Sequence, residues 1–296
     1  MNEAPAEPLD IRLQTPRGAM AGLHWASPDG PRVLAIHGWL DNAASFVPLA
    51  AHLPGLDLVA LDLPGHGHSD HRHESANYYL TDYLFDIDAA LDALGWDSCH
   101  LLGHSLGGAI TSLYASAAPQ RVLSLTTLDG LGPPGAAAGE TASRLRKSLD
   151  RNRRPHSPRK VYESLDAMVS ARLSNSTDLD PGAARLLCER SARRDEDGFR
   201  WRFDPALYWV SPVFMAEEQV LDCLNAITAP VLSIGAVPLA RWITPEQAQA
   251  RIDAVPAGHH RTVHGNHHFH MDQAETVSST IRQFILEQQT RNEDST

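Results

Sequence analysis

A serine between two glycines is the first group in the chain that could do chemistry. Residues 103–107 read Gly-His-Ser-Leu-Gly, with Ser105 at the centre. The apolar run before it is typical of a buried strand, and the Ala- and Leu-rich stretch 106–118 predicts a helix that Pro119 ends. A tight turn between a strand and a helix presents a serine hydroxyl at the helix N-terminus, the arrangement called a nucleophile elbow. We therefore predict that Ser105 is a nucleophile.

A serine hydroxyl reacts only when a base removes its proton, and four histidines in one short segment could be that base. They occupy positions 264, 267, 268 and 270. His267 follows the Gly-Asn turn at 265–266, after a predicted strand, where a side chain can reach back over the sheet edge. We therefore predict His267 as the base. His268 and His270 remain alternatives, with packing against the last helix as their other role.

The third member of such a triad is a carboxylate that orients the imidazole. Its commonest position in this topology is the loop 234–240, which contains no Asp or Glu. Asp129 ends the predicted strand 122–128, next to the elbow strand, and is the alternative location. We predict that Asp129 is the acid. Its other possible role is to cap the turn into Gly130.

Acyl transfer also needs two N–H groups that stabilise the oxyanion. We predict the backbone N–H groups of Leu106, next to the nucleophile, and Trp39, where Gly38 allows a close backbone approach. Aromatic and imidazole side chains near these segments are expected to line the substrate pocket. They are His37, Trp39, His104, Trp209 and Phe214.

Strands and helices alternate along the chain in a way that positions these groups. Two short strands, 10–15 and 19–25, predict a hairpin. Apolar strand runs then alternate with amphipathic helix patterns, which predicts a parallel sheet covered by helices. The predicted strands are 33–36, 56–61, 99–102, 122–128, 230–234 and 260–264, and the predicted helices are 45–53, 78–94, 106–118, 244–255 and 271–289.

The alternation stops at 133–227, where the sequence is polar and helix-like, without strand alternation. We interpret this stretch as an inserted helical cap, and residues 1–132 and 228–296 as the core domain. The cap is rich in basic residues. They could be a solvated face or a patch against the acidic core, or they could recruit an anionic substrate or carrier. They are Arg144, Arg146, Lys147, Arg151, Arg153, Arg154, Arg159 and Lys160.

Composition excludes several function classes. The formal net charge of −11 argues against nucleic-acid binding and against an anionic membrane surface. The three cysteines are scattered, the first residues show no secretory pattern, and no apolar run has membrane-spanning length, so we expect a cytoplasmic protein. Four histidines at positions 66, 68, 71 and 73 match no firm ligand spacing. We expect neither a metal nor a cofactor, and the oligomeric state stays open.

These segments together resemble the α/β-hydrolase family. The resemblance is carried by residues 37–42, 62–69, 103–105, 128–129 and 265–271, in the family's order. It is strongest to the serine hydrolase-like branch, which is related to haloalkane dehalogenases and epoxide hydrolases. Those two enzyme groups use a carboxylate at the elbow, where this chain has Ser105, so their reactions are not implied. The missing acid in 234–240 departs from the commonest family pattern, but an acid at the position of Asp129 has precedent among the dehalogenase-like relatives.

The resemblance and the residues together imply a serine hydrolase that cleaves carboxylic esters through an acyl-enzyme. Ser105 would attack, His267 would transfer the proton and Asp129 would orient His267. The expected partner is a small-molecule ester. Two alternatives stay open, namely a thioesterase or acyltransferase acting on a carrier-bound acyl group, and a catalytically silent binding protein.

Overall fold

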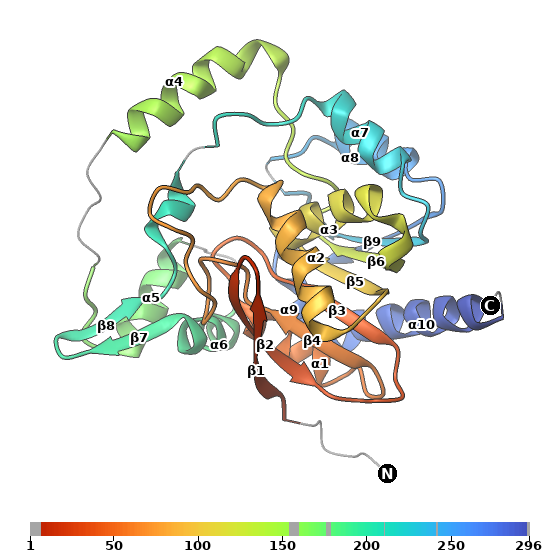
Figure 1. The fold of residues 1–296 in the computed structure, drawn as a ribbon, viewed down its shortest axis with the longest axis horizontal. Coiled ribbons are helices and arrows are strands. Elements are labelled where there is room, and N and C mark those ends of the chain that lie inside the picture. Colours follow the sequence, from red (N-terminus) through yellow and green to blue (C-terminus); the bar gives the residue numbers. More distant parts are fainter. Residues whose placement is uncertain (1–6, 154–159, 176–178, 210, 241, 295–296) are drawn as a thin grey trace.

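A twisted sheet of eight strands runs through the centre of the described residues (Figure 1). The structure is a computed structural model and describes residues 7–153, 160–175, 179–209, 211–240 and 242–294. The strand order is β1-β2-β4-β3-β5-β6-β9-β10. The bounds are β1 Leu9–Thr15, β2 Gly18–Trp25, β3 Arg32–Ile36, β4 Asp57–Leu61, β5 Cys99–His104, β6 Val122–Leu128, β9 Val231–Val237 and β10 Gly258–His264. The predicted α/β-hydrolase architecture is confirmed.

Strand direction follows the sequence pattern. The predicted hairpin is present as the antiparallel pair β1 and β2, and β2 is also antiparallel to β4. The remaining neighbours are parallel. The apolar run 33–36 of β3 is completely buried because helices cover both faces of the sheet there.

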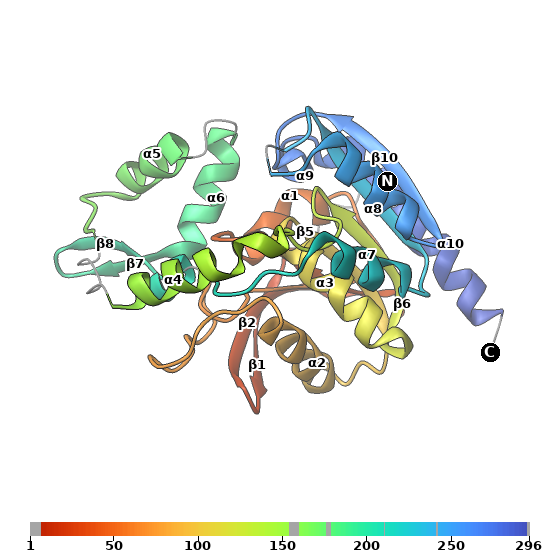
Figure 2. The ribbon, with the colours of Figure 1, turned by 90° about the horizontal axis from the view of Figure 1, so that it is seen from above.

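Two hydrophobic cores lie on the two faces of the sheet. On one face, β-strand side chains pack against α2 (Asp82–Leu94), α3 (Leu106–Ala117) and α7 (Glu217–Asn225). On the other face they pack against η1 (Ala43–Phe46), α1 (Val47–Ala50), α9 (Phe269–Asp272) and α10 (Ala274–Glu293). Figure 2 shows α2 and α3 on one side of the sheet and α9 and α10 on the other. One more helix, α8 (Pro245–Ala254), connects β9 to β10.

Three predicted helices have different bounds, and tertiary contacts accompany two of these differences. The predicted helix 45–53 is the short pair η1 and α1. The predicted helix 78–94 begins only at Asp82, since the Tyr78 hydroxyl is held by Arg72 N–H and donates to Asp204 of the inserted segment. The last helix is divided at Gln273, whose side-chain amide donates to the carbonyl of His264 at 2.8 Å.

The segment between β6 and β9 is not purely helical, which corrects the prediction. It contains α4 (Thr141–Asn152), α5 (Leu165–Asn175) and α6 (Pro181–Ser191), and then a hairpin of β7 (Ala192–Asp195) and β8 (Gly198–Trp201). Gly198, at φ +135°, permits the tight turn. The short helix η4 (Pro205–Tyr208) follows. Helix α7 lies inside the predicted cap boundaries, yet its Val220 and Leu224 belong to the core beneath α3.

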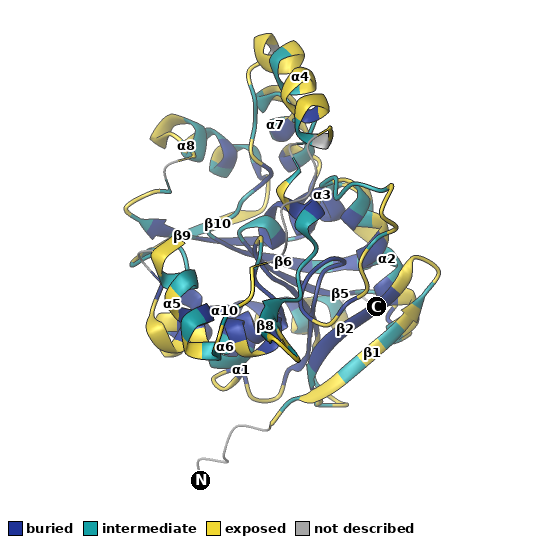
Figure 3. Cartoon of the chain, turned by 90° about the vertical axis from the view of Figure 1, so that its left-hand side faces the viewer, coloured by how far each residue is buried: buried dark blue, intermediate teal, exposed yellow. Residues whose placement is uncertain are grey.

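The basic helix α4 stands away from the sheet and is largely exposed (Figure 3). Arg144 lies over the ring of Phe214, at 4.2 Å from the ring centroid, and also contacts Glu140. Arg154 and Arg159 of the predicted basic group lie outside the described residues. None of the helices in the described ranges is both long and apolar enough to cross a membrane.

Buried polar contacts attach the inserted segment to the core. Arg190 of α6 pairs with Asp62, which follows β4 and also accepts hydrogen bonds from the backbone N–H groups of Ala43 and His68. The Asn42 amide donates to the carbonyl of Leu187. These contacts hold α6 over the carboxyl end of the sheet, where Ser105, Asp129 and His267 lie.

Candidate active site

Ser105 occupies a strained turn between β5 and α3. Its φ of +52° lies in the region that L-residues rarely adopt. A Cβ at Gly103 would come within 2.5 Å of the Gly107 carbonyl oxygen, and a Cβ at Gly107 within 1.9 Å of the Ile36 carbonyl oxygen. The two glycines are therefore required because backbone segments touch at both positions.

Asp129 is fixed against the same turn. Its own φ is +49°, and its backbone N–H donates to the carbonyl of Ile234 at 2.8 Å. One carboxylate oxygen, Oδ1, accepts from the backbone N–H of Ala236 at 3.0 Å. The loop 234–240 thus supplies a hydrogen-bond donor to the carboxylate rather than an acid. The positive φ turns the Asp129 side chain toward the carboxyl edge of the sheet.

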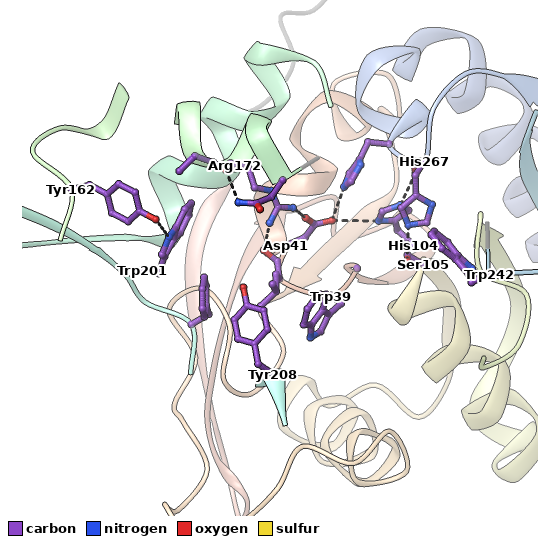
Figure 4. A pocket seen from close by; sticks show the side chains of 16 residues that line it. Trp39, Asp41, His104, Ser105, Tyr162, Arg172, Trp201, Tyr208, Trp242 and His267 are labelled. Atoms are coloured by element: carbon purple, nitrogen blue, oxygen red, sulfur yellow. Dashed lines mark hydrogen bonds and ion pairs between the residues drawn. The ribbon is translucent and has the colours of Figure 1, made fainter. Parts of the chain in front are cut away.

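His267 joins these two residues in one hydrogen-bonded line. Figure 4 shows His267 beside Ser105. Its Nδ1 lies 2.6 Å from Asp129 Oδ2, and its Nε2 lies 2.8 Å from Ser105 Oγ. Because a carboxylate only accepts, Nδ1 carries the proton and Nε2 is free to accept the serine proton. The ring of Trp242 packs edge-on against the imidazole, with 4.8 Å between ring centroids.

The other histidines of the segment lie elsewhere. His264 ends β10 and is exposed. His270 is buried and its Nε2 is 2.7 Å from the hydroxyl of Ser45. The Nε2 of His268 lies 3.2 Å from Asp41 Oδ2. Of the four histidines, His267 alone contacts Ser105 in this structure.

The carboxylate of Asp129 remains ionised. Burial by itself would raise its pKa, but the hydrogen bonds from His267 and from Ala236 N–H hold the pKa below its ordinary value. A carboxylate that stays charged can fix the Nδ1–H tautomer of His267 and stabilise an imidazolium.

The predicted oxyanion donors lie on adjoining backbone segments. Leu106 is the first residue of α3, so its N–H has no acceptor within the helix. The loop of Gly38 and Trp39 follows β3, and the close contact of Gly107 with Ile36 brings that loop against the start of α3. The geometry thus places both segments at the elbow.

Two cavities meet at Ser105. One, of about 600 Å³, is the more polar of the two and is called the polar cavity below; Asp41, Arg172, Asn175 and His267 lie in its wall. The other, of about 490 Å³, is mainly apolar, with Leu106, Leu131, Phe214 and Ile243 in its wall. Trp39 and Trp242 line both. The inserted segment contributes aromatic rings to the polar cavity, namely Tyr162, Trp201, Phe203 and Tyr208.

Three of the five predicted pocket residues line these cavities and two do not. Trp39 and His104 line the polar cavity, and Phe214 lines the apolar one. His37 is completely buried instead, because its two ring nitrogens bond to the backbone of Leu63 and Gly38. Trp209, the residue after η4, lies in the wall of neither cavity, whereas its neighbour Tyr208 lines the polar one.

Sequence reasoning missed Trp242, Asp41 and Arg172. Trp242 lies just beyond the segment 234–240, in which related proteins commonly carry the acid. An aromatic residue so close to that position could have been predicted to line the pocket. The pairing of Arg172 with Asp41 joins residues far apart in the chain, and no local pattern indicates it.

The fold agrees with the comparisons with known proteins. Residues 31–274 match the model of the α/β hydrolase fold family, and the chain belongs to this family.

Within the family, the chain is close to the serine hydrolase-like proteins. A serine hydrolase-like protein of Dictyostelium discoideum is 29% identical over 97% of this chain and 84% of its own length. Serine hydrolase-like protein 2 of Homo sapiens is 29% identical over 96% of both chains. A hypothetical protein of Pseudomonas aeruginosa PAO1, whose crystal structure is known, is 35% identical over 95% of this chain and 100% of that one, with a TM-score of 0.86.

Proposed function

We propose that this α/β hydrolase cleaves carboxylic esters through an acyl-enzyme formed on Ser105. The observation that carries the proposal is the line Asp129–His267–Ser105, with hydrogen bonds of 2.6 Å and 2.8 Å. These distances lie within the reach that proton transfer requires. The nucleophile, the base and the orienting acid are then already in position before a substrate binds.

In the first half of the reaction, Ser105 Oγ attacks the ester carbonyl carbon while His267 Nε2 takes the serine proton. The oxyanion accepts hydrogen bonds from the N–H groups of Trp39 and Leu106. His267 then gives the proton to the departing alkoxide, and the alcohol leaves. In the second half, His267 activates a water molecule that opens the acyl ester and regenerates Ser105.

The two cavities divide between the two halves of the substrate. The leaving group must receive its proton from His267, which lines the polar cavity and not the apolar one. We therefore assign the alcohol portion to the polar cavity. The acyl chain extends past Leu106 into the apolar cavity, where its burial contributes roughly 0.8 kcal/mol per methylene. The preferred substrate is an ester with an apolar acyl chain and a polar alcohol.

Hydrolysis of p-nitrophenyl esters of increasing acyl length tests the proposal. We expect turnover by the unaltered protein and labelling of Ser105 by a fluorophosphonate probe, with both lost in Ser105→Ala. Activity of Ser105→Ala equal to that of the unaltered chain would overturn the proposal. Absence of both labelling and turnover would favour a catalytically silent binding protein, and turnover restricted to acyl-thioesters would favour the thioesterase alternative.

A further inference from the structure

A second group of polar side chains lies in the polar cavity and has no part in the proposed hydrolysis. Asp41 Oδ2, His104 Nδ1 and His268 Nε2 lie within 4.8 Å of one another. Asp41 is in the loop after β3, His104 ends β5, and His268 follows the proposed base. All three residues line the cavity that contains Ser105. Asp41 and His104 are buried, and the His268 side chain is 12% exposed.

One nitrogen in this group is left without a partner. The Nε2 of His104 lies 2.8 Å from the carbonyl oxygen of His267, which only accepts, so Nε2 carries the proton. An imidazole that carries its proton on Nε2 has a lone pair on Nδ1. Among the described residues Nδ1 makes no hydrogen bond, and it faces Asp41 Oδ2 at 3.5 Å. A cation between two buried acceptors that face each other would satisfy both of them.

The spacing of the donors fits a small metal ion. Zinc bonds of about 2.0–2.2 Å in a tetrahedral site place neighbouring donor atoms about 3.4 Å apart. Asp41 Oδ2 lies 3.5 Å from His104 Nδ1 and 3.2 Å from His268 Nε2. The missing side chain of Gly38 leaves room beside two of these atoms, because a Cβ there would come within 2.9 Å of His104 Nδ1 and 3.1 Å of Asp41 Oδ2.

We propose that Asp41, His104 and His268 bind one divalent transition-metal ion, and that Zn²⁺ fits best. Two imidazole nitrogens and one carboxylate oxygen are the donor set that zinc prefers, and the fourth position faces the cavity, where water can bind.

Arg172 supports the carboxylate ligand without occupying the proposed site. It pairs with Asp41 Oδ1 and leaves Oδ2 for the metal. The positive charge of the Arg172 guanidinium beside the carboxylate favours the anionic form that a metal ligand needs. An outer hydrogen bond of this kind orients a metal-binding carboxylate.

A metal ion at this position would inhibit the hydrolase, a consequence that rests on the proposed function. The His104 and His268 rings have centroids 4.8 Å and 5.4 Å from that of His267. His267 must become positively charged during catalysis, and a nearby dication disfavours that charge. Bound metal would therefore lower kcat.

Calorimetric titration of the full chain with ZnCl₂ near neutral pH tests the binding directly. We expect one site in the unaltered protein and about tenfold or greater loss of affinity in His268→Gln and Asp41→Asn. The matched control is His73→Gln, a change at an exposed histidine, which should bind zinc as before. His267→Ala should also retain the site. Co²⁺ should give a visible absorption band that His268→Gln abolishes.

Unchanged zinc affinity in both His268→Gln and Asp41→Asn would overturn the proposal. Loss of binding in His267→Ala with retention in His268→Gln would also overturn it and assign the metal to the Ser105 site. In parallel, zinc inhibition of ester hydrolysis should be lost in His268→Gln, measured against the metal-free rate of the same variant. If the protein hydrolyses no ester, the proposed function fails, while the calorimetry and the Co²⁺ spectrum still decide the metal site.

Discussion

Ser105 and Asp129 are two of the three non-glycine residues with a positive φ in the described part of the chain, and they lie side by side. Each has a positive φ, and Ser105 N–H donates to the carbonyl of Leu128, immediately before Asp129. A Cβ at Gly130 would come within 2.4 Å of the Ser105 carbonyl oxygen. The two turns therefore stabilise each other, and the strain at each is compensated by the backbone contacts between them.

The carboxylate of Asp129 sets the tautomer of His267, which gives a prediction at the residue scale. Asp129→Asn replaces an acceptor by a group that can donate to Nδ1, and this favours the tautomer with its proton on Nε2. We expect kcat for p-nitrophenyl esters to fall by about 10³–10⁴-fold, with little change in KM. Steady-state kinetics measure the effect, and a loss under about tenfold would contradict a triad role for Asp129.

Some residues of the candidate site follow from local sequence patterns, and others depend on contacts between distant segments. The glycines at 103 and 107 and the serine between them are a local pattern, so the elbow was accessible from sequence. The choice of His267 over His268 and His270 depended on which side chain reaches Ser105 across the sheet edge. His37 and Trp209 were expected in the pocket wall. His37 is instead held in the interior by hydrogen bonds to the backbone of Leu63 and Gly38, and Tyr208 rather than Trp209 lines the polar cavity.

At the scale of elements, α6 attaches the inserted segment to the core through a buried ion pair. Arg190, 8% exposed, contacts Asp62, which is completely buried. Removing one partner of a buried ion pair leaves an uncompensated buried charge and lowers the free energy of unfolding. An exposed ion pair contributes little to that free energy. Helix α6 offers the exposed counterpart as well, because Arg185 pairs with Asp166 on the surface.

We expect Arg190→Met to lower the free energy of unfolding by about 3–5 kcal/mol, since the carboxylate of Asp62 loses its cation. The same substitution at Arg185 on the same helix should have little effect. Urea denaturation followed by circular dichroism measures both. Equal destabilisation by the two substitutions would show that the buried pair does not hold α6 in place.

At the scale of the whole molecule, histidine burial makes stability depend on pH. Burial lowers the pKa of His66 to about 3 and that of His104 to about 4, from an ordinary value of 6.5. Below pH 6.5 the unfolded chain takes up protons at these rings while the folded chain does not. The unfolded state is then favoured, so stability is present above that pH and is lost as the pH falls toward the folded pKa values.

Each of these two rings should reduce the free energy of unfolding by about 1.4 kcal/mol for each pH unit below the ordinary histidine value. Urea denaturation at a series of pH values between neutral and moderately acidic conditions measures the slope. His66→Asn should flatten it, and His73→Gln, a change at an exposed ring, is the matched control. A stability that is independent of pH over this range would contradict the burial of neutral histidines.

The sequence by itself determined the alternation of strands and helices, the elbow at Ser105 and the family, because apolar periodicity and the need for glycine are local properties of the chain. Only the tertiary structure decided that Asp129 and His267 meet, that the inserted segment carries the hairpin of β7 and β8, and that Asp41, His104 and His268 converge. These three residues come from separate segments. Their juxtaposition depends on how strand ends and loops pack together, which no pattern within one segment encodes.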